Sequence, residues 1–345
     1  MGLEVSIKKK TGDFTLDVSF NCEDQVTSLL GASGSGKSMT LKCIAGIETP
    51  DEGRIVLNGR ELFDSGKKIN LIPQERKVGY MFQDYALFPN MTVRQNIEIA
   101  CESKSESISY IDRFQLSDIA DLYPSQLSGG QKQRTAMARM LAAKPDMLML
   151  DEPFAALDSH LKWQIENEVK KILREEKKPA LFVSHDRDEV YRLSEHAGII
   201  VNGKMKGVSD TRELFRNPRT RSAAAVTGCK NVTRAVKTDE FKVSAPDWGM
   251  EFELASPVPF TEGYIGIRAH SFEMVDSGYG DRNCLNIKFS EISEEPFEWN
   301  VSFKTDESAE WIQWKISKDM FRQCEEIIPE KLWVKPENIM LLQDD

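Results

Sequence analysis

Eight residues near the N-terminus have the types and spacing that bind a polyphosphate. They match the pattern G-x-x-x-x-G-K-[ST] and are Gly31, Ala32, Ser33, Gly34, Ser35, Gly36, Lys37 and Ser38. The glycines let the backbone wrap around phosphate groups, so that its N–H groups face the negative charge. We expect Lys37 to reach the β- and γ-phosphates and the Ser38 hydroxyl to bind Mg²⁺. A plain glycine-rich turn is the alternative, but an apolar run, Gln25–Leu30, precedes the motif and a helical pattern, Met39–Ile47, follows it.

Two adjacent carboxylates, Asp151 and Glu152, follow a second apolar run, Met147–Leu150. Because side chains alternate along a strand, the two should point in different directions. One can then face a Mg²⁺ ion and the other a water beside the γ-phosphate, which is the division that a nucleotide-hydrolysing enzyme needs. Solvated acids at a strand end are the alternative, and the phosphate-binding motif upstream makes it the less favoured one.

A second place for an anion lies between these two motifs. Ser128, Gly129, Gly130 and Gln131 open a helical pattern that continues over Lys132–Ala143. Serine is a favoured N-cap, and the first turn of a helix presents unpaired N–H groups to a negative charge. One domain would therefore carry two phosphate-binding places.

The string Leu127–Gln131 (LSGGQ) resembles the signature motif of the ABC transporter ATPases. The resemblance implies ATP hydrolysis as the activity, with ATP and Mg²⁺ as cofactors. It also implies that each ATP is held between the phosphate-binding loop of one subunit and Ser128–Gln131 of its partner. Two such sites related by a two-fold axis make a homodimer the expected assembly.

Three further positions match motifs of the same family, and a fourth residue, Phe14, is a candidate for a family role without such a match. Gln83, in VGYMFQDY, resembles the glutamine loop that senses the γ-phosphate and Mg²⁺. The resemblance therefore gives Gln83 a catalytic role together with Glu152 and His185. It also gives Gln83 a metal-binding role together with Ser38 and Asp151. Asp158 resembles the loop that passes between the subunits beside the nucleotide. His185 resembles the switch histidine that contacts the γ-phosphate, although a lone histidine at a strand end is more often structural. Phe14 is the candidate for the aromatic that stacks on adenine, with a position in the strand core as its alternative.

Residues 1–228 alternate apolar strands with amphipathic helices, which predicts an α/β domain with a parallel sheet. The resemblance implies that this domain is an α/β P-loop NTPase cassette with a helical subdomain at about 85–145. Residues 229–345 read as short alternating strands such as Tyr264–Arg268 and Cys284–Phe289, which predicts a small β-barrel or sandwich. Tyr264–Arg268 also resembles a strand of the transport-associated domain of importer ATPases, which implies a small C-terminal all-β, OB-like domain of that type. This second part holds 13 Lys+Arg and 23 Asp+Glu of the chain's 45 and 55, so it accounts for the whole net charge of −10. Its acidity argues against oxyanion binding and favours a role in dimer support.

Bulk properties exclude several classes of protein. The net charge of −10 argues against nucleic-acid binding, which normally shows a basic excess. No apolar run is long enough to span a bilayer, and the first residues lack the apolar segment of a signal peptide. The six cysteines show no metal-binding spacing. Together with the absence of a spanning run, the resemblance to transporter ATPases implies a peripheral protein at the cytoplasmic face of the cell membrane.

The resemblance also implies partners. The family's groove for a short permease helix corresponds to Tyr85–Asn96, where Leu87, Phe88 and Met91 suit helix-in-groove binding. A solute-binding protein would act indirectly, through the permease. Arg60–Gln83 resembles molybdate importer ATPases, so molybdate or a related oxyanion is the expected solute. Sulfate, ferric ion, sugar or polyamine import is the alternative, followed by a soluble ABC protein without a transport role and by an inactive regulatory cassette.

Overall fold

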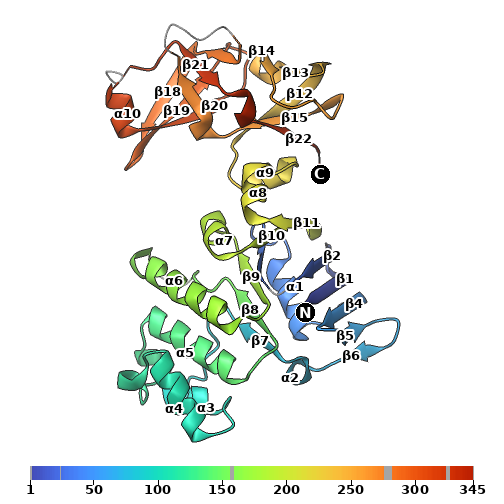
Figure 1. Cartoon of the computed structure of the whole chain (residues 1–345), viewed down its shortest axis with the longest axis vertical. Coiled ribbons are helices and arrows are strands. Elements are labelled where there is room, and N and C mark those ends of the chain that lie inside the picture. The colour runs from blue at the N-terminus through green and yellow to red at the C-terminus, as the bar shows by residue number, and fades with distance from the viewer. Residues whose placement is uncertain (1, 24, 156–158, 276–281, 324–326, 345) are drawn as a thin grey trace. The chain divides into compact units, whose positions relative to one another are not determined.

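The computed structural model divides into two compact units, Met1–Arg212 and Glu213–Asp345 (Figure 1). The structure describes residues 2–23, 25–155, 159–275, 282–323 and 327–344. The predicted ranges, 1–228 and 229–345, would leave helix α9 (Arg221–Val226) in the first domain. In the structure Ala224 of α9 packs against Cys229, Met340 and Leu342, which is why the division falls earlier.

The first unit is an α/β cassette. Its strands are β1 (Leu3–Thr11), β2 (Phe14–Cys22), β3 (Val26–Leu30), β4 (Glu52–Leu57), β5 (Arg60–Asp64), β6 (Ile69–Asn70), β7 (Val78–Met81), β8 (Met147–Asp151), β9 (Ala180–Ser184), β10 (His196–Val201) and β11 (Lys204–Asp210). Its helices are α1 (Lys37–Ala45), α2 (Pro73–Arg76), α3 (Val93–Glu98), α4 (Lys104–Arg113), α5 (Gly129–Ala142), α6 (Ser159–Glu176) and α7 (Arg187–Leu193). In the part of the chain that the structure describes, no helix is long and apolar enough to cross a bilayer.

Among the described residues these strands form one sheet, in the order β6-β5-β4-β1-β2-β11-β10-β3-β9-β8-β7. The segment β10-β3-β9-β8-β7 is parallel throughout. Every residue of β3, β8 and β9 is buried, as expected for parallel strands that are covered on both faces. The carboxyl ends of these three neighbouring strands therefore meet at one edge of the sheet, which is where α/β proteins bind ligands.

The predicted helical subdomain corresponds to α3, α4 and α5, which lie together at one end of the first unit (Figure 1). Each begins at a side-chain cap. Thr92, Ser103 and Ser128 accept hydrogen bonds from backbone N–H groups three residues further on.

A buried arginine caps the carboxyl end of the helix that follows the phosphate-binding loop. Arg76 of α2 is 1% exposed and donates to the carbonyl oxygens of Cys43 and Ile44, in the last turn of α1, at 2.8 and 2.7 Å. It also donates to the Leu71 carbonyl and the Asn70 side chain. These bonds satisfy carbonyls that a helix end leaves unpaired, and they fix α1 beneath its loop.

The second unit is mostly β. Its strands are β12 (Asn231–Asp239), β13 (Lys242–Ala245), β14 (Met250–Glu253), β15 (Glu262–Ile267), β16 (Phe272–Met274), β17 (Cys284–Asn286), β18 (Phe289–Glu294), β19 (Glu298–Lys304), β20 (Ile312–Ser317), β21 (Lys331–Val334) and β22 (Ile339–Leu342). Its helices are α8 (Thr211–Arg216, which begins at the end of the first unit), α9 and α10 (Lys318–Gln323). Among the described residues the strands of this unit form three small antiparallel sheets around a core that contains Trp248, Phe252 and Trp314.

One predicted strand of this unit is wrong in detail. Cys284–Phe289 is not continuous, because β17 ends at Asn286 and pairs with β21, whereas β18 begins at Phe289 and pairs with β19. The chain changes partner between them, so a single alternating pattern covers two strands.

Candidate active site

The phosphate-binding loop connects β3 to α1, as the motif predicts. Gly34 and Gly36 have φ angles of +76° and +107°, in the region that glycine adopts without strain. A Cβ at Gly36 would lie 2.7 Å from Cδ1 of Leu16 and 3.1 Å from the Phe14 ring. Only a residue without a side chain fits there, so the loop can pass close over β2.

Lys37 lies at the bottom of this loop. It is 4% exposed, and its Nζ donates to the carbonyl oxygens of Gly31 and Ala32 at 2.8 and 2.9 Å. Burial lowers the pKa of its amine, and the negative charges of Glu152 and Asp151 oppose that shift. The loop thus holds one cation whose present partners are neutral carbonyls, which a phosphate can replace.

Asp151 ends β8 with both carboxylate oxygens bonded. Its Oδ1 accepts from the Ser38 hydroxyl and its Oδ2 from the Tyr80 hydroxyl, each at 2.7 Å. Burial, together with the charge and hydrogen bond of Asp151, raises the pKa of Tyr80. The sequence patterns do not single out Tyr80, because its role depends on β7 lying beside β8. Its only signal is its place in VGYM, the run that leads to Gln83.

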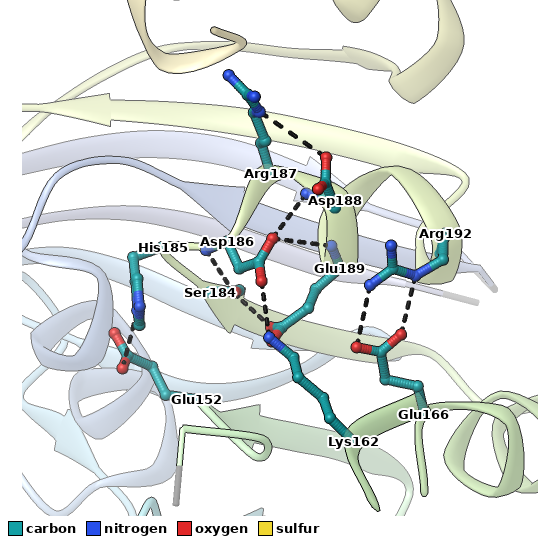
Figure 2. A network of polar contacts seen from close by, with 10 residues as sticks. All are labelled: Glu152, Lys162, Glu166, Ser184, His185, Asp186, Arg187, Asp188, Glu189 and Arg192. Atoms are coloured by element: carbon teal, nitrogen blue, oxygen red, sulfur yellow. Dashed lines mark hydrogen bonds and ion pairs between the residues drawn. The ribbon is translucent and has the colours of Figure 1, made fainter. Parts of the chain in front are cut away.

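Glu152 points to a different partner from Asp151, as predicted, but β8 ends at Asp151, so strand alternation is not the cause. Its Oε2 lies 3.1 Å from Nδ1 of His185, which follows β9 (Figure 2). The His185 side chain is 58% exposed and that of Glu152 is 19% exposed. Glu152 has a φ of +44°, a conformation that costs about 1–3 kcal/mol and is concentrated at functional sites.

The signature segment begins α5 with a reciprocal cap. The Ser128 hydroxyl accepts from the Gln131 backbone N–H at 3.3 Å, and the Gln131 side chain accepts from the Ser128 backbone N–H at 2.8 Å. A Cβ at Gly130 would lie 2.7 Å from Cδ1 of Ile165 on α6, so this glycine permits close helix packing. Ser128 itself is exposed, with the start of its helix at the surface of the described chain.

The structure places the remaining predicted residues as follows. Phe14 begins β2, is partly buried and lies against Gly36 and Gly203, next to the loop. Gln83 is exposed just after β7 and makes no hydrogen bond among the described residues. Asp158 lies outside the described residues. The structure therefore brings Ser38, Asp151, Glu152 and His185 together in two bonded pairs, and leaves Gln83 unattached.

Comparisons with known proteins show the family to which the chain belongs. The family model of the ABC transporter matches residues 15–155. The chain is 34% identical over 313 residues to the Fe(3+) ions import ATP-binding protein FbpC of Haemophilus influenzae, and the match covers 88% of both chains. The chain belongs to the ABC transporter family. It is also 37% identical over 225 residues to the molybdenum import ATP-binding protein ModC of Paramagnetospirillum magneticum, a match that covers 64% of this chain and 62% of that protein.

A solved structure of the same kind is the dimeric ATP-binding cassette MJ0796 in a post-hydrolysis state, bound to ADP and Pi. Its TM-score is 0.52 and its identity 27%, and the match covers 61% of this chain and 99% of that one. The predicted ABC cassette, the binding of ATP and its hydrolysis in an import system are therefore confirmed. The predicted fold class, an α/β cassette followed by small all-β sheets, is also confirmed.

The two tyrosines of this region give a matched pair for testing the geometry. Tyr80→Phe is expected to lower the free energy of unfolding by about 1–3 kcal/mol, because it removes a hydrogen bond to a buried carboxylate. Tyr85→Phe is expected to cause no loss, because the Tyr85 hydroxyl is buried without a partner among the described residues. Urea unfolding without nucleotide measures both. Equal losses in the two variants would contradict the bond between Tyr80 and Asp151.

Proposed function

We propose that this chain works as a homodimer whose two ATP sites are shared, and that it drives import of molybdate or a related oxyanion. The observation that carries the proposal is the presence, on one chain, of two separate phosphate-binding features. One is the loop over Lys37 with its bonded carboxylates, and the other is the helix start at Ser128. The cassette dimers among the similar solved structures support pairing of each loop with the Ser128 end of a second copy.

The backbone of Gly31–Ser38 and the Lys37 amine would hold the phosphates of ATP. The Ser38 hydroxyl and the Asp151 carboxylate already lie together, and hard oxygen donors of this kind fit Mg²⁺. Gln83, exposed just after β7, would complete the protein ligands. Bound there, Mg²⁺ would neutralise charge on the phosphates.

Glu152 is the proposed catalytic base. It is a partly exposed carboxylate beside the loop, whereas both oxygens of Asp151 already have partners. Through its bond to Glu152, His185 would orient that carboxylate and contact the γ-phosphate. Phe14, whose ring lies against the loop at Gly36, would stack on adenine, and Asp158 would lie at the contact with the second copy.

The segment Tyr85–Asn96 is the proposed docking site for a permease at the cytoplasmic face of the membrane. Arg139, near the end of α5, donates to the carbonyl oxygens of Tyr85 and Ala86 at 3.1 and 2.8 Å, and its guanidinium lies 5.1 Å from the centre of the Phe88 ring. Asn96 accepts from the backbone N–H of Phe88 and donates to three carbonyls of the segment.

These bonds hold the docking segment in shape while Phe88 stays 44% exposed, as an apolar contact for a partner helix. The helix that supplies Arg139 begins at Ser128. One rigid element thus joins the proposed inter-subunit nucleotide contact to the proposed permease contact.

Molybdate import is supported by relatives named molybdenum import ATP-binding protein ModC, which match 64–68% of this chain. Ferric ion import is the second candidate, because the relatives with that name match 88% of the chain and so extend through the second unit.

Glu152→Gln is the test of the shared site. The variant should bind ATP, form a stable dimer and lose at least about 100-fold in turnover, because a positioned base contributes on that order. Analytical ultracentrifugation with and without ATP, together with phosphate release, measures this. The control is Glu61→Gln, which alters a carboxylate on β5 that is paired with Arg54 and Lys67. This variant should behave as the wild type. Near-normal hydrolysis by Glu152→Gln would contradict the assignment.

Uptake by the source organism tests the solute. Deleting the gene for this chain should abolish uptake of radiolabelled molybdate and spare that of ferric ion, and a plasmid copy of the gene should restore it while the Glu152→Gln copy should not. If the deletion abolished only the uptake of ferric ion, the transported solute would be ferric ion and the molybdate proposal would be wrong.

A further inference from the structure

A network of charged side chains surrounds the turn that carries His185. Lys162 of α6 places its Nζ 2.7 Å from Oδ2 of Asp186 and 2.6 Å from Oε1 of Glu189 (Figure 2). The other oxygen of Glu189 accepts from the Ser184 hydroxyl at 2.6 Å. One ammonium group and one carboxylate thus connect α6, the end of β9 and α7.

The network bonds the chain on both sides of His185. Ser184, the residue before it, also accepts from the Asp186 backbone N–H at 2.9 Å. Asp186, the residue after it, caps α7 by accepting from the backbone N–H groups of Asp188 and Glu189. The backbone of His185 is therefore held between two residues that both depend on the same cluster.

Lys162 is the group that makes this cluster stable. The Glu189 side chain is 5% exposed, and burial raises its pKa. Burial also opposes the charge of Lys162, but the hydrogen bonds to Asp186 and Glu189 outweigh it and raise the pKa of the amine. Removing the cation would leave a buried carboxylate without a counter-charge, so Glu189 and the residues bonded to it would have to move.

We propose that Lys162 is a positioning residue for ATP hydrolysis, which acts by fixing the turn Ser184–Asp186 so that His185 meets Glu152. The inference rests on the proposed role of His185. It adds a connection that the site alone does not contain. α6 follows the Asp158 segment directly in the sequence, so Lys162 joins the helix after the proposed inter-subunit contact to the turn that carries His185.

The chain contains a matched control for this proposal. Arg192 of α7 donates to both carboxylate oxygens of Glu166 on α6, at 2.8 and 3.0 Å, so it joins the same two helices (Figure 2). Glu166 is also buried, at 3% exposure. This pair has no bond to Ser184, His185 or Asp186 among the described residues, and its loss should weaken the helix contact without moving His185.

The experiment compares Lys162→Met, Lys162→Arg and Arg192→Met in the full chain. Lys162→Met should lower kcat for ATP hydrolysis by about 10-fold or more, with less than about a two-fold change in KM, because it disturbs a catalytic contact rather than the phosphate-binding loop. Lys162→Arg should restore most of kcat. Lys162→Met and Arg192→Met should lower the melting temperature by similar amounts, because each leaves a buried carboxylate unpaired. Arg192→Met should nevertheless keep kcat close to that of the wild type.

Two further variants separate positioning from misfolding. Lys162→Met combined with Glu189→Gln removes the unpaired buried charge, so it should recover stability while kcat stays low. The ring resonances of His185, assigned with His185→Ala, should shift in Lys162→Met and stay unchanged in Arg192→Met.

The outcomes distinguish this inference from the proposed function on which it rests. Unchanged His185 resonances in Lys162→Met, or an equal fall of kcat in Lys162→Met and Arg192→Met, would overturn the role of Lys162. Full activity of His185→Ala would instead overturn the role of His185, and the resonances would still show whether Lys162 positions the ring.

Discussion

The site depends on three buried parallel strands that end at the same edge of one sheet. β3, β9 and β8 are neighbours in that order, and each is followed by a functional segment. The phosphate-binding loop follows β3, Asp151 ends β8 with Glu152 directly after it, and His185 follows β9. Their apolar residues remove the strands from water, and the parallel pairing places all three segments together. The chemistry is thus assembled from positions far apart in the sequence.

The two adjacent carboxylates show how one strand end provides two environments. Asp151 is buried, and each of its carboxylate oxygens accepts a hydrogen bond from a hydroxyl group. This arrangement suits a fixed metal ligand. Glu152 follows the strand with a positive φ and reaches an exposed histidine, an arrangement that suits the proposed catalytic base. The strained backbone at Glu152 is what turns the second side chain away from the first.

Much of this could be predicted from the sequence, because the motifs at Gly31–Ser38, Ser128–Gln131 and Asp151–Glu152 are local and their elements have clear periodicity. Tyr80, Lys162 and Arg139 could not, because each acts on a residue that only the tertiary fold brings close. A lysine four residues after Asp158 looks like a solvated helix position until α7 is placed beside α6. The prediction of one continuous strand over Cys284–Phe289 is wrong for a similar reason, because a change of partner strand leaves the alternating pattern intact.

The central claim is that each ATP site is shared between two copies of this chain, and mixing two inactive variants tests it most directly. Lys37→Ala removes the phosphate-binding cation, and Ser128→Arg blocks the helix start, so each homodimer should be inactive. A mixture should regain up to about one quarter of the wild-type rate, because about half of the dimers are mixed and each of these has one intact site. A mixture that stays as inactive as its two components would contradict the shared site.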